Sequence, residues 1–135
     1  MLYIIVIVAL IAIGFAVYVR LAPSDAARWH QMPEGAERQD FDGGCIRIGT
    51  TGPQGISLLD RIIMSGPRTQ VLAGSVEDGM VTYIIRSKLW GFPDYVTVRQ
   101  LGDTLQIYSR LRFGKSDMGV NKTRVDGWLS VLARQ

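Results

Sequence analysis

Hydrophobic residues fill almost every one of the first 19 positions, and polar positions recur only after them. This segment, MLYIIVIVALIAIGFAVYV, contains no charged side chain. As a helix it would be about 28 Å long at about 1.5 Å per residue, close to the hydrocarbon thickness of a bilayer. A core helix of a small soluble protein normally has a polar face, which this segment lacks. The pattern therefore predicts a transmembrane helix over residues 1–20.

The flanks of this helix favour a retained single-pass anchor over a cleaved signal peptide. No basic residue precedes the apolar run, Arg20 follows it directly, and residues 25–27 are only a weak match to a cleavage site. Arg20 and Arg28 lie on the C-terminal flank, so the positive-inside tendency would keep the rest of the chain in the cytoplasm. That preference is weak, because the imbalance is only one or two charges.

Residues 21–44 change in composition to Pro, Gly, Ala and charged residues. They predict a juxtamembrane connector with little regular structure. Trp29 has two interpretations, as an interfacial membrane residue or as a residue that packs on the domain. His30, the only histidine, is expected to be solvated. Residues 45–135 then form one domain, because a chain of 135 residues has room for one and not two.

Within the domain a helical period is followed by a period of two. After a short strand at 45–48, apolar residues recur at the spacing of one helical face, which predicts a helix over about 55–64. Beyond Pro67 the residues alternate, and turn signals at 77–79 and 101–103 predict two antiparallel hairpins. The two hairpins are separated by a loop that contains Pro93.

The alternation gives each strand one apolar and one polar face, as in an antiparallel sheet that is covered on one side. Residues 104–113 show it most clearly, with Leu105 and Ile107 on the apolar face. A final apolar stripe predicts a helix over 120–133, capped by Asn121 or by the preceding Asp117. Two helices and about four antiparallel strands predict an α+β fold with the helices packed on the apolar face of the sheet.

Charge is distributed unevenly along the chain. Residues 21–85 carry five basic and eight acidic groups, a net −3, whereas residues 86–135 carry nine basic and four acidic groups, a net +5. Arg20 supplies the remaining +1 of the net +3. The basic C-terminal half favours an anionic partner or lipid headgroups, but no nucleic-acid-binding motif accompanies it. The single cysteine, Cys45, is expected to be a small buried residue.

The stretch from Ser109 to Trp128 contains the candidate site. Arg110 and Arg112 share the polar face of the last strand, and Arg99 can lie on that face across the hairpin. The loop GKSDMG follows, and the closing helix begins with free backbone N–H groups. Guanidinium groups beside a helix N-terminus favour an anion. The candidate ligand- or partner-binding residues are Arg99, Arg110, Arg112, Lys115, Ser116, Asp117, Asn121 and Arg124.

A purely structural interpretation of these residues competes with the binding one. An ion pair between Arg124 and Asp117, or between Arg112 and Asp126, would simply join strand, loop and helix. Catalytic interpretations are weaker, because GKS lacks the first glycine of a phosphate loop and nothing orients His30 toward a nucleophile. No paired His and Cys set is present for a metal, so we assign no catalytic residue, metal ligand or cofactor.

The same residues carry a resemblance to a known family. FPDYVTV, followed by IYSRLRFGKSDMGVNKTRVDGWLSVL, resembles the C-terminal half of domain-of-unknown-function family 1499 (DUF1499). The match covers about 68–132, and Thr123 departs from the basic residue of some members. The family positions that match are Arg110, Arg112, Gly114, Ser116, Asp117, Gly119, Asn121 and Arg124. The resemblance implies a small α+β domain of a kind often exported or membrane-tethered, and so a periplasmic location.

These observations lead us to expect a non-enzymatic accessory protein with a single span in a bacterial cytoplasmic membrane. Its basic corner would contact a membrane-protein complex or an envelope partner. One alternative is a carrier of lipid or a small anion, which would need an apolar cavity lined by Tyr83, Tyr108 and Trp128. A second alternative is a hydrolase that uses Ser116 and Asp117.

Overall fold

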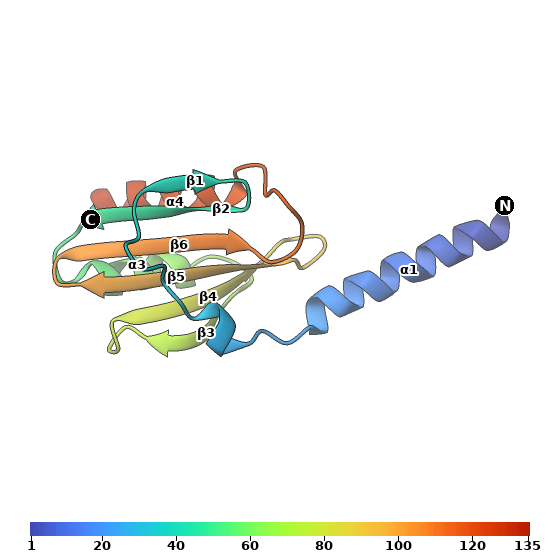
Figure 1. The fold of residues 1–135 in the computed structure, drawn as a ribbon, viewed down its shortest axis with the longest axis horizontal. Coiled ribbons are helices and arrows are strands. Elements are labelled where there is room, and N and C mark those ends of the chain that lie inside the picture. Colours follow the sequence, from blue (N-terminus) through green and yellow to red (C-terminus); the bar gives the residue numbers. More distant parts are fainter.

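Figure 1 shows a long helix that projects from one end of a layered domain. The structure is a computed structural model that describes residues 1–135. The projecting helix is α1 (Leu2–Leu21), which is long and apolar enough to cross a membrane. The elements that follow are α2 (Ala26–Trp29), β1 (Gln39–Phe41), β2 (Gly44–Thr50), α3 (Gly55–Met64), β3 (Thr69–Ser75), β4 (Met80–Arg86), β5 (Pro93–Leu101), β6 (Thr104–Leu111) and α4 (Val120–Ala133).

The strands form one six-stranded sheet in the order β1-β2-β6-β5-β4-β3, and every neighbouring pair is antiparallel. Together with the helices packed against it, this sheet confirms the predicted α+β class. The two predicted hairpins are present as β3–β4 and β5–β6. Pro93, which was predicted to lie in a loop, is the first residue of β5, a position that proline tolerates.

The hydrophobic core lies between one face of the sheet and the pair α3 and α4. Both helices begin and end where the apolar periodicity predicts, because each presents one apolar stripe to the sheet. Cys45 is fully buried in this core, as expected, and burial raises the pKa of its thiol to about 11. The buried core residues are Cys45, Ile56, Leu59, Ile63, Val81, Tyr83, Ile85, Val96, Val98, Leu105, Ile107 and Val125.

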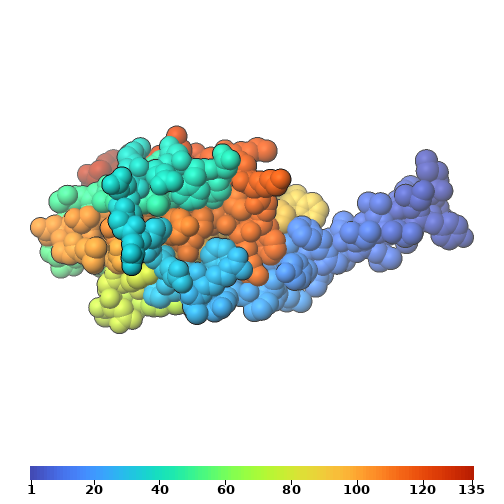
Figure 2. All heavy atoms as spheres, viewed as in Figure 1, coloured from blue at the N-terminus to red at the C-terminus, as the bar shows by residue number.

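Residues 21–44, which we call the connector, cross the second face of the sheet before they join its edge as β1 (Figure 2). Figure 2 shows this segment lying across the face of the domain that is turned toward the viewer. Trp29 stacks on Tyr95 with ring centroids 4.0 Å apart and an interplanar angle of 13°. His30 Nδ1 lies 2.8 Å from Thr82 Oγ1 and is therefore not simply solvated. Of the two interpretations of Trp29, the structure supports packing on the domain.

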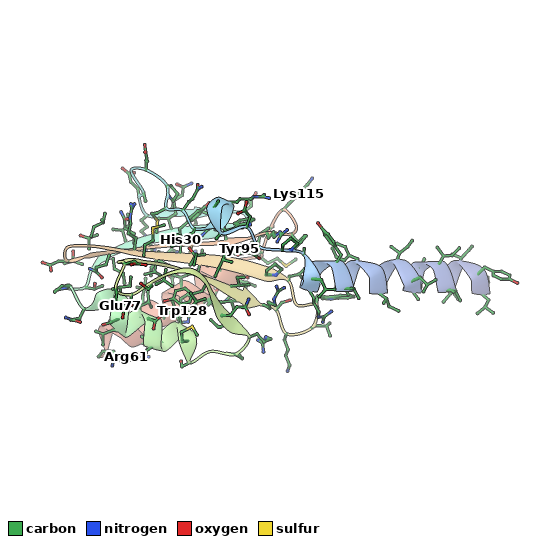
Figure 3. The ribbon with its side chains drawn as sticks, turned by 90° about the horizontal axis from the view of Figure 1, so that it is seen from below. His30, Arg61, Glu77, Tyr95, Lys115 and Trp128 are labelled. Atoms are coloured by element: carbon green, nitrogen blue, oxygen red, sulfur yellow. The ribbon has the colours of Figure 1, made fainter.

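Figure 3 views the sheet nearly edge on, with His30 on the connector side and Trp128 on the helix side. The connector was predicted to have little regular structure, but α2 and the short edge strand β1 form within it. Asp25 begins α2 by accepting a hydrogen bond from the N–H of Ala27 at 3.0 Å. Both faces of the sheet are thus covered, although only the helix face was predicted to be.

The last two turns of α1 pack against the domain. Val19 is only 1% exposed, and its carbonyl accepts a hydrogen bond of 3.3 Å from Arg86. Arg20 donates to the carbonyl of Leu89 at 2.9 Å. The ring of Phe15 lies 6.1 Å from that of Phe92. These contacts fix one end of the sheet against the helix, and we call it the α1 end of the domain.

Candidate functional site

Arg110 lies on the connector face of the sheet and is only 6% exposed. Its guanidinium donates to Thr97 Oγ1 at 2.8 Å, to the carbonyl of Tyr108 at 3.1 Å and to the carbonyl of Trp29. The Tyr108 ring lies 4.1 Å from its Cζ. Burial lowers the pKa of Arg110 to about 10, which still leaves the side chain charged at neutral pH. Arg110 therefore holds the connector on the sheet, and no open cationic surface is formed here.

Arg112 continues the same face toward the α1 end. Its NH1 group donates to the carbonyl of Pro23 and to the hydroxyl oxygen of Tyr95, both at 3.0 Å. The same hydroxyl lies 2.6 Å from Ser24 Oγ. Arg112 is half-buried and makes no ion pair, so part of its charge is available to a ligand. The ion pair that was considered between Arg112 and Asp126 is absent, because Asp126 pairs with Arg47.

Arg99 shares this face, as the alternation predicted, but it does not join the other two arginines. In the register of β5 and β6, Arg99 is opposite Gln106, whereas Arg110 is opposite Tyr95. Four residues of strand separate the two pairs, or about 13 Å at about 3.3 Å per residue. The Nε group of Arg99 instead donates to Gln106 Oε1 at 2.8 Å.

The loop between β6 and α4 carries the next three candidates. Asp117 caps α4, because its carboxylate accepts hydrogen bonds of 2.9 Å from the N–H groups of Gly119 and Asn121. Ser116 Oγ accepts from the N–H of Met118 at 3.2 Å. Lys115 is exposed, and Figure 3 places it near the end of the sheet from which α1 projects. The carboxylate and the carbonyl of Asp117 thus accept from the N–H groups of Asn121 and Val120, which were expected to face an anion.

Asn121 is fully buried beneath this loop. Its side-chain nitrogen donates to Asp117 Oδ2 at 2.7 Å, and its oxygen accepts from the hydroxyl of Ser109. Strand β6, the loop and α4 are thereby joined through one amide group. Asn121 therefore has a structural role in the fold and does not face a ligand.

Arg124 lies on the helix side of the sheet, opposite the other arginines. It pairs with Asp94 at 3.2 Å and not with Asp117. Burial raises the pKa of Asp94, and the charge of Arg124 opposes that rise. The predicted cluster of arginines is therefore divided by the sheet, because the chain crosses from one face to the other between β6 and α4.

The residues of the two alternative functions are also separated. Tyr83 is buried in the core, where its hydroxyl donates to Asp60 at 2.6 Å. Tyr108 lies on the connector face, where it contacts Arg110, whereas Trp128 packs on the core from α4. No pocket is lined by these aromatic residues together. For the hydrolase, Asp117 is committed to the cap, and His30 bonds to Thr82.

A groove of about 440 Å³ lies between α1 and the β6–α4 loop. Phe15, Phe92 and Phe113 form its apolar wall. Two of the candidate residues, Ser116 and Asp117, line its other side. The aromatic wall was missed by the sequence reasoning, because its three rings come from three separate parts of the chain. We call this groove, with Arg112 and Lys115 beside it, the corner of the domain.

Sequence reasoning also missed Arg47, whose side chain is 1% exposed at the centre of β2. It forms ion pairs with Asp40 at 2.6 Å and with Asp126 at 2.8 Å. Hydrogen bonds from Arg47 hold the pKa of both carboxyl groups below the usual range. The only signal in the sequence was a charged residue among the apolar residues of the short strand at 45–48. Both of its partners are internal, so we assign Arg47 to stability.

Comparison with known proteins gives a family and no function. No curated protein matches the chain. A family model described as "Protein of unknown function (DUF1499)" matches residues 25–132. This range begins before the part on which the resemblance was recognised, and it includes most of the connector that covers the sheet. The matched range therefore takes in the connector as well as the sheet and helices of this chain, and the chain belongs to DUF1499.

Proposed function

We propose that this protein is a non-enzymatic binding module that α1 holds against a bacterial cytoplasmic membrane. The observation that carries the proposal is the docking of α1. Val19 is buried by the domain, and both Arg20 and Arg86 bond across the junction. A helix whose last turns belong to the packing of the domain is better suited to retention than to cleavage. The domain would then keep a fixed orientation toward the bilayer.

The residues around the junction support this placement. Phe15 lies six residues before the end of α1 at Leu21, which is about 9 Å along the helix axis at about 1.5 Å per residue. Phe92 and Phe113 contact Phe15 and therefore lie at the same depth. Tryptophan and tyrosine are enriched at the membrane–water interface, and Tyr18 of α1 lies beside Phe113. In the β4–β5 loop Leu89 is 75% exposed and Trp90 is 44% exposed, as expected of a loop that touches lipid.

The corner is the surface that we propose for a partner. It combines a groove that has an aromatic wall, and that Asp94 and Asp117 also line, with Arg112 and Lys115, neither of which forms an ion pair. Apolar walls with a few charged groups are typical of binding sites. A partner within or beside the membrane, such as a subunit of a membrane-protein complex, would reach this corner next to α1. The family resemblance favours a periplasmic domain.

Two fractionation experiments test the anchor and its orientation. The full-length protein should remain in the membrane pellet after an alkaline carbonate wash, and its intact mass should include residues 1–20. Release, or a mass that lacks the helix, would exclude a retained anchor. Protease added to spheroplasts should digest the domain if it is periplasmic, and protection would place it in the cytoplasm.

A third experiment tests the corner. Lys115 is exposed and makes no side-chain hydrogen bond, so Lys115→Glu should leave the fold intact. It should reduce co-purification of a partner after solubilisation in mild detergent. Arg134→Glu is the matched control, because Arg134 is also exposed and lies at the C-terminal end of α4, away from α1. Equal recovery of the partner with both variants would exclude the corner.

A further inference from the structure

A second pocket at the α1 end is polar and adjoins the groove of the corner, with which it shares only Ser87. Its volume is about 540 Å³, and no acidic side chain lines it. Its four basic residues come from four different segments: Arg20 from the end of α1, Arg68 from the turn before β3, Arg86 from the end of β4 and Lys88 from the β4–β5 loop. The pocket is within the range of about 300–1,000 Å³ that is typical of small-molecule sites.

None of these four charges is neutralised within the protein. The ion pairs of the chain involve Arg47, Lys122 and Arg124 only. Arg20 and Arg86 each donate to a backbone carbonyl across the α1 junction, and Arg86 also donates to the carbonyl of Gly91. Four cations that converge without a carboxylate repel one another, and an anion would relieve that repulsion. Their arrangement therefore points to an anionic ligand.

Arg68 is held in place by its neighbours. Its backbone is left-handed, with φ of 54°, which is unusual for a residue other than glycine. Its Nε group donates to the carbonyl of Arg86 at 2.9 Å, and the N–H of Arg86 donates to the carbonyl of Arg68 at 3.0 Å. The two terminal nitrogens of Arg68 make no hydrogen bond within the protein, so this forked pair of donors is available to a ligand. Such a fork matches the oxygens of a phosphate group.

The position of the pocket indicates which kind of molecule would bring a phosphate group to it. Arg20 is in the last turn of α1, where a transmembrane helix reaches the headgroup layer. Lys88 directly precedes the exposed Leu89 and Trp90 of the loop that we place against lipid. A soluble anion would need no such neighbours, whereas a phospholipid would place its phosphate among the cations and its acyl chains beside α1.

We propose that this pocket binds the phosphate of an anionic phospholipid headgroup. The inference rests on the proposed function, since it requires α1 to be in a membrane. The bound lipid would join α1 to the edge formed by β3 and β4, next to the partner corner. Lipid binding and partner binding would then occupy adjoining surfaces of the same end of the domain, with Ser87 between them.

The test uses full-length protein in detergent, titrated with short-chain phosphatidylglycerol or phosphatidylcholine and followed by native mass spectrometry. Arg20 and Arg86 are left unchanged because they also hold α1. The test variant is R68Q/K88Q, and the control R61Q/R134Q removes two charges from exposed residues outside the pocket. At about 1 kcal/mol per basic residue near an anionic surface, the test variant should bind phosphatidylglycerol about 30-fold more weakly. The control should match the wild type.

Several outcomes would overturn the proposal. Equal affinity for the two lipids would exclude recognition of an anionic headgroup. If both double variants lost affinity for phosphatidylglycerol equally, binding would depend on the net charge of the protein and not on this pocket. Displacement of phosphatidylglycerol by inorganic phosphate at similar concentration would assign the pocket to a soluble anion. A carbonate wash tests the anchor separately from the pocket. Both the wild-type protein and the R68Q/K88Q variant should stay in the pellet, and release of the wild-type protein would refute the anchor whatever the pocket binds.

Discussion

Replacement of Trp29 by alanine tests whether the connector is part of the folded domain. Complete burial of a tryptophan is worth about 3–5 kcal/mol in a Trp→Ala substitution. Trp29 is only half-buried, so about half of that applies, and its stack on Tyr95 adds about 0.5–1.5 kcal/mol. We therefore expect the free energy of unfolding to fall by about 2–4 kcal/mol. Trp29→Phe keeps a stacked ring and should lose less.

The assay is urea unfolding of the full-length protein in detergent, followed by circular dichroism. Trp90→Ala is the matched control, because Trp90 is 44% exposed and its ring stacks only on Phe92, which precedes β5, so its loss should be smaller than that of Trp29. If Trp29→Ala costs less than about 0.5 kcal/mol, the connector does not stabilise the domain. In that case the interfacial interpretation of Trp29 would be preferred.

Three further predictions concern buried polar groups. Asp126 has a lowered pKa through Arg47, so its contribution to stability is present above its unfolded pKa of about 3.9 and is lost as the pH falls. Asp126→Asn should therefore weaken the loss of stability on acidification, measured as urea midpoints from neutral pH downward, and an unchanged pH profile would contradict the pairing. Asn121→Ala should cost about 1–3 kcal/mol in the same assay, because Ser109 loses its buried partner, and a neutral effect would contradict that role. Cys45 should resist alkylation at mildly alkaline pH until the protein is unfolded, and rapid labelling of the folded protein would contradict its burial.

Much of the fold could be predicted, because local periodicity determines it. The strands of the β5–β6 hairpin each alternate between an apolar and a polar face, and the glycine turn at Gly102 sets the pairing. This alternation correctly placed Arg99, Arg110 and Arg112 on one face. It carries no information on what covers that face. The connector has no periodicity, and its contacts, such as the stack of Trp29 on Tyr95 and the hydrogen bond between His30 and Thr82, are made with distant strands.

The candidate site was predicted less completely, because its partners are distant in sequence. Arg47 and Asp126 are 79 residues apart, and nothing near either residue in the sequence indicates the other. Arg124 was grouped with Arg110 because both are close in the chain, but the loop between them crosses the end of the sheet. The basic pocket was missed for the converse reason. Arg20 and Lys88 are 68 positions apart and meet only through the docking of α1.

The most direct test of the central claim, that α1 holds this end of the domain against lipid, is the depth of Trp90. A full-length variant with Trp29→Phe and Trp128→Phe leaves Trp90 as the only fluorophore of its kind, since the chain has three tryptophans. In vesicles that contain brominated phospholipids, its fluorescence should be strongly quenched by bromines near the headgroups and weakly quenched by aqueous iodide. Quenching by iodide alone, with no effect of the brominated lipids, would contradict the account.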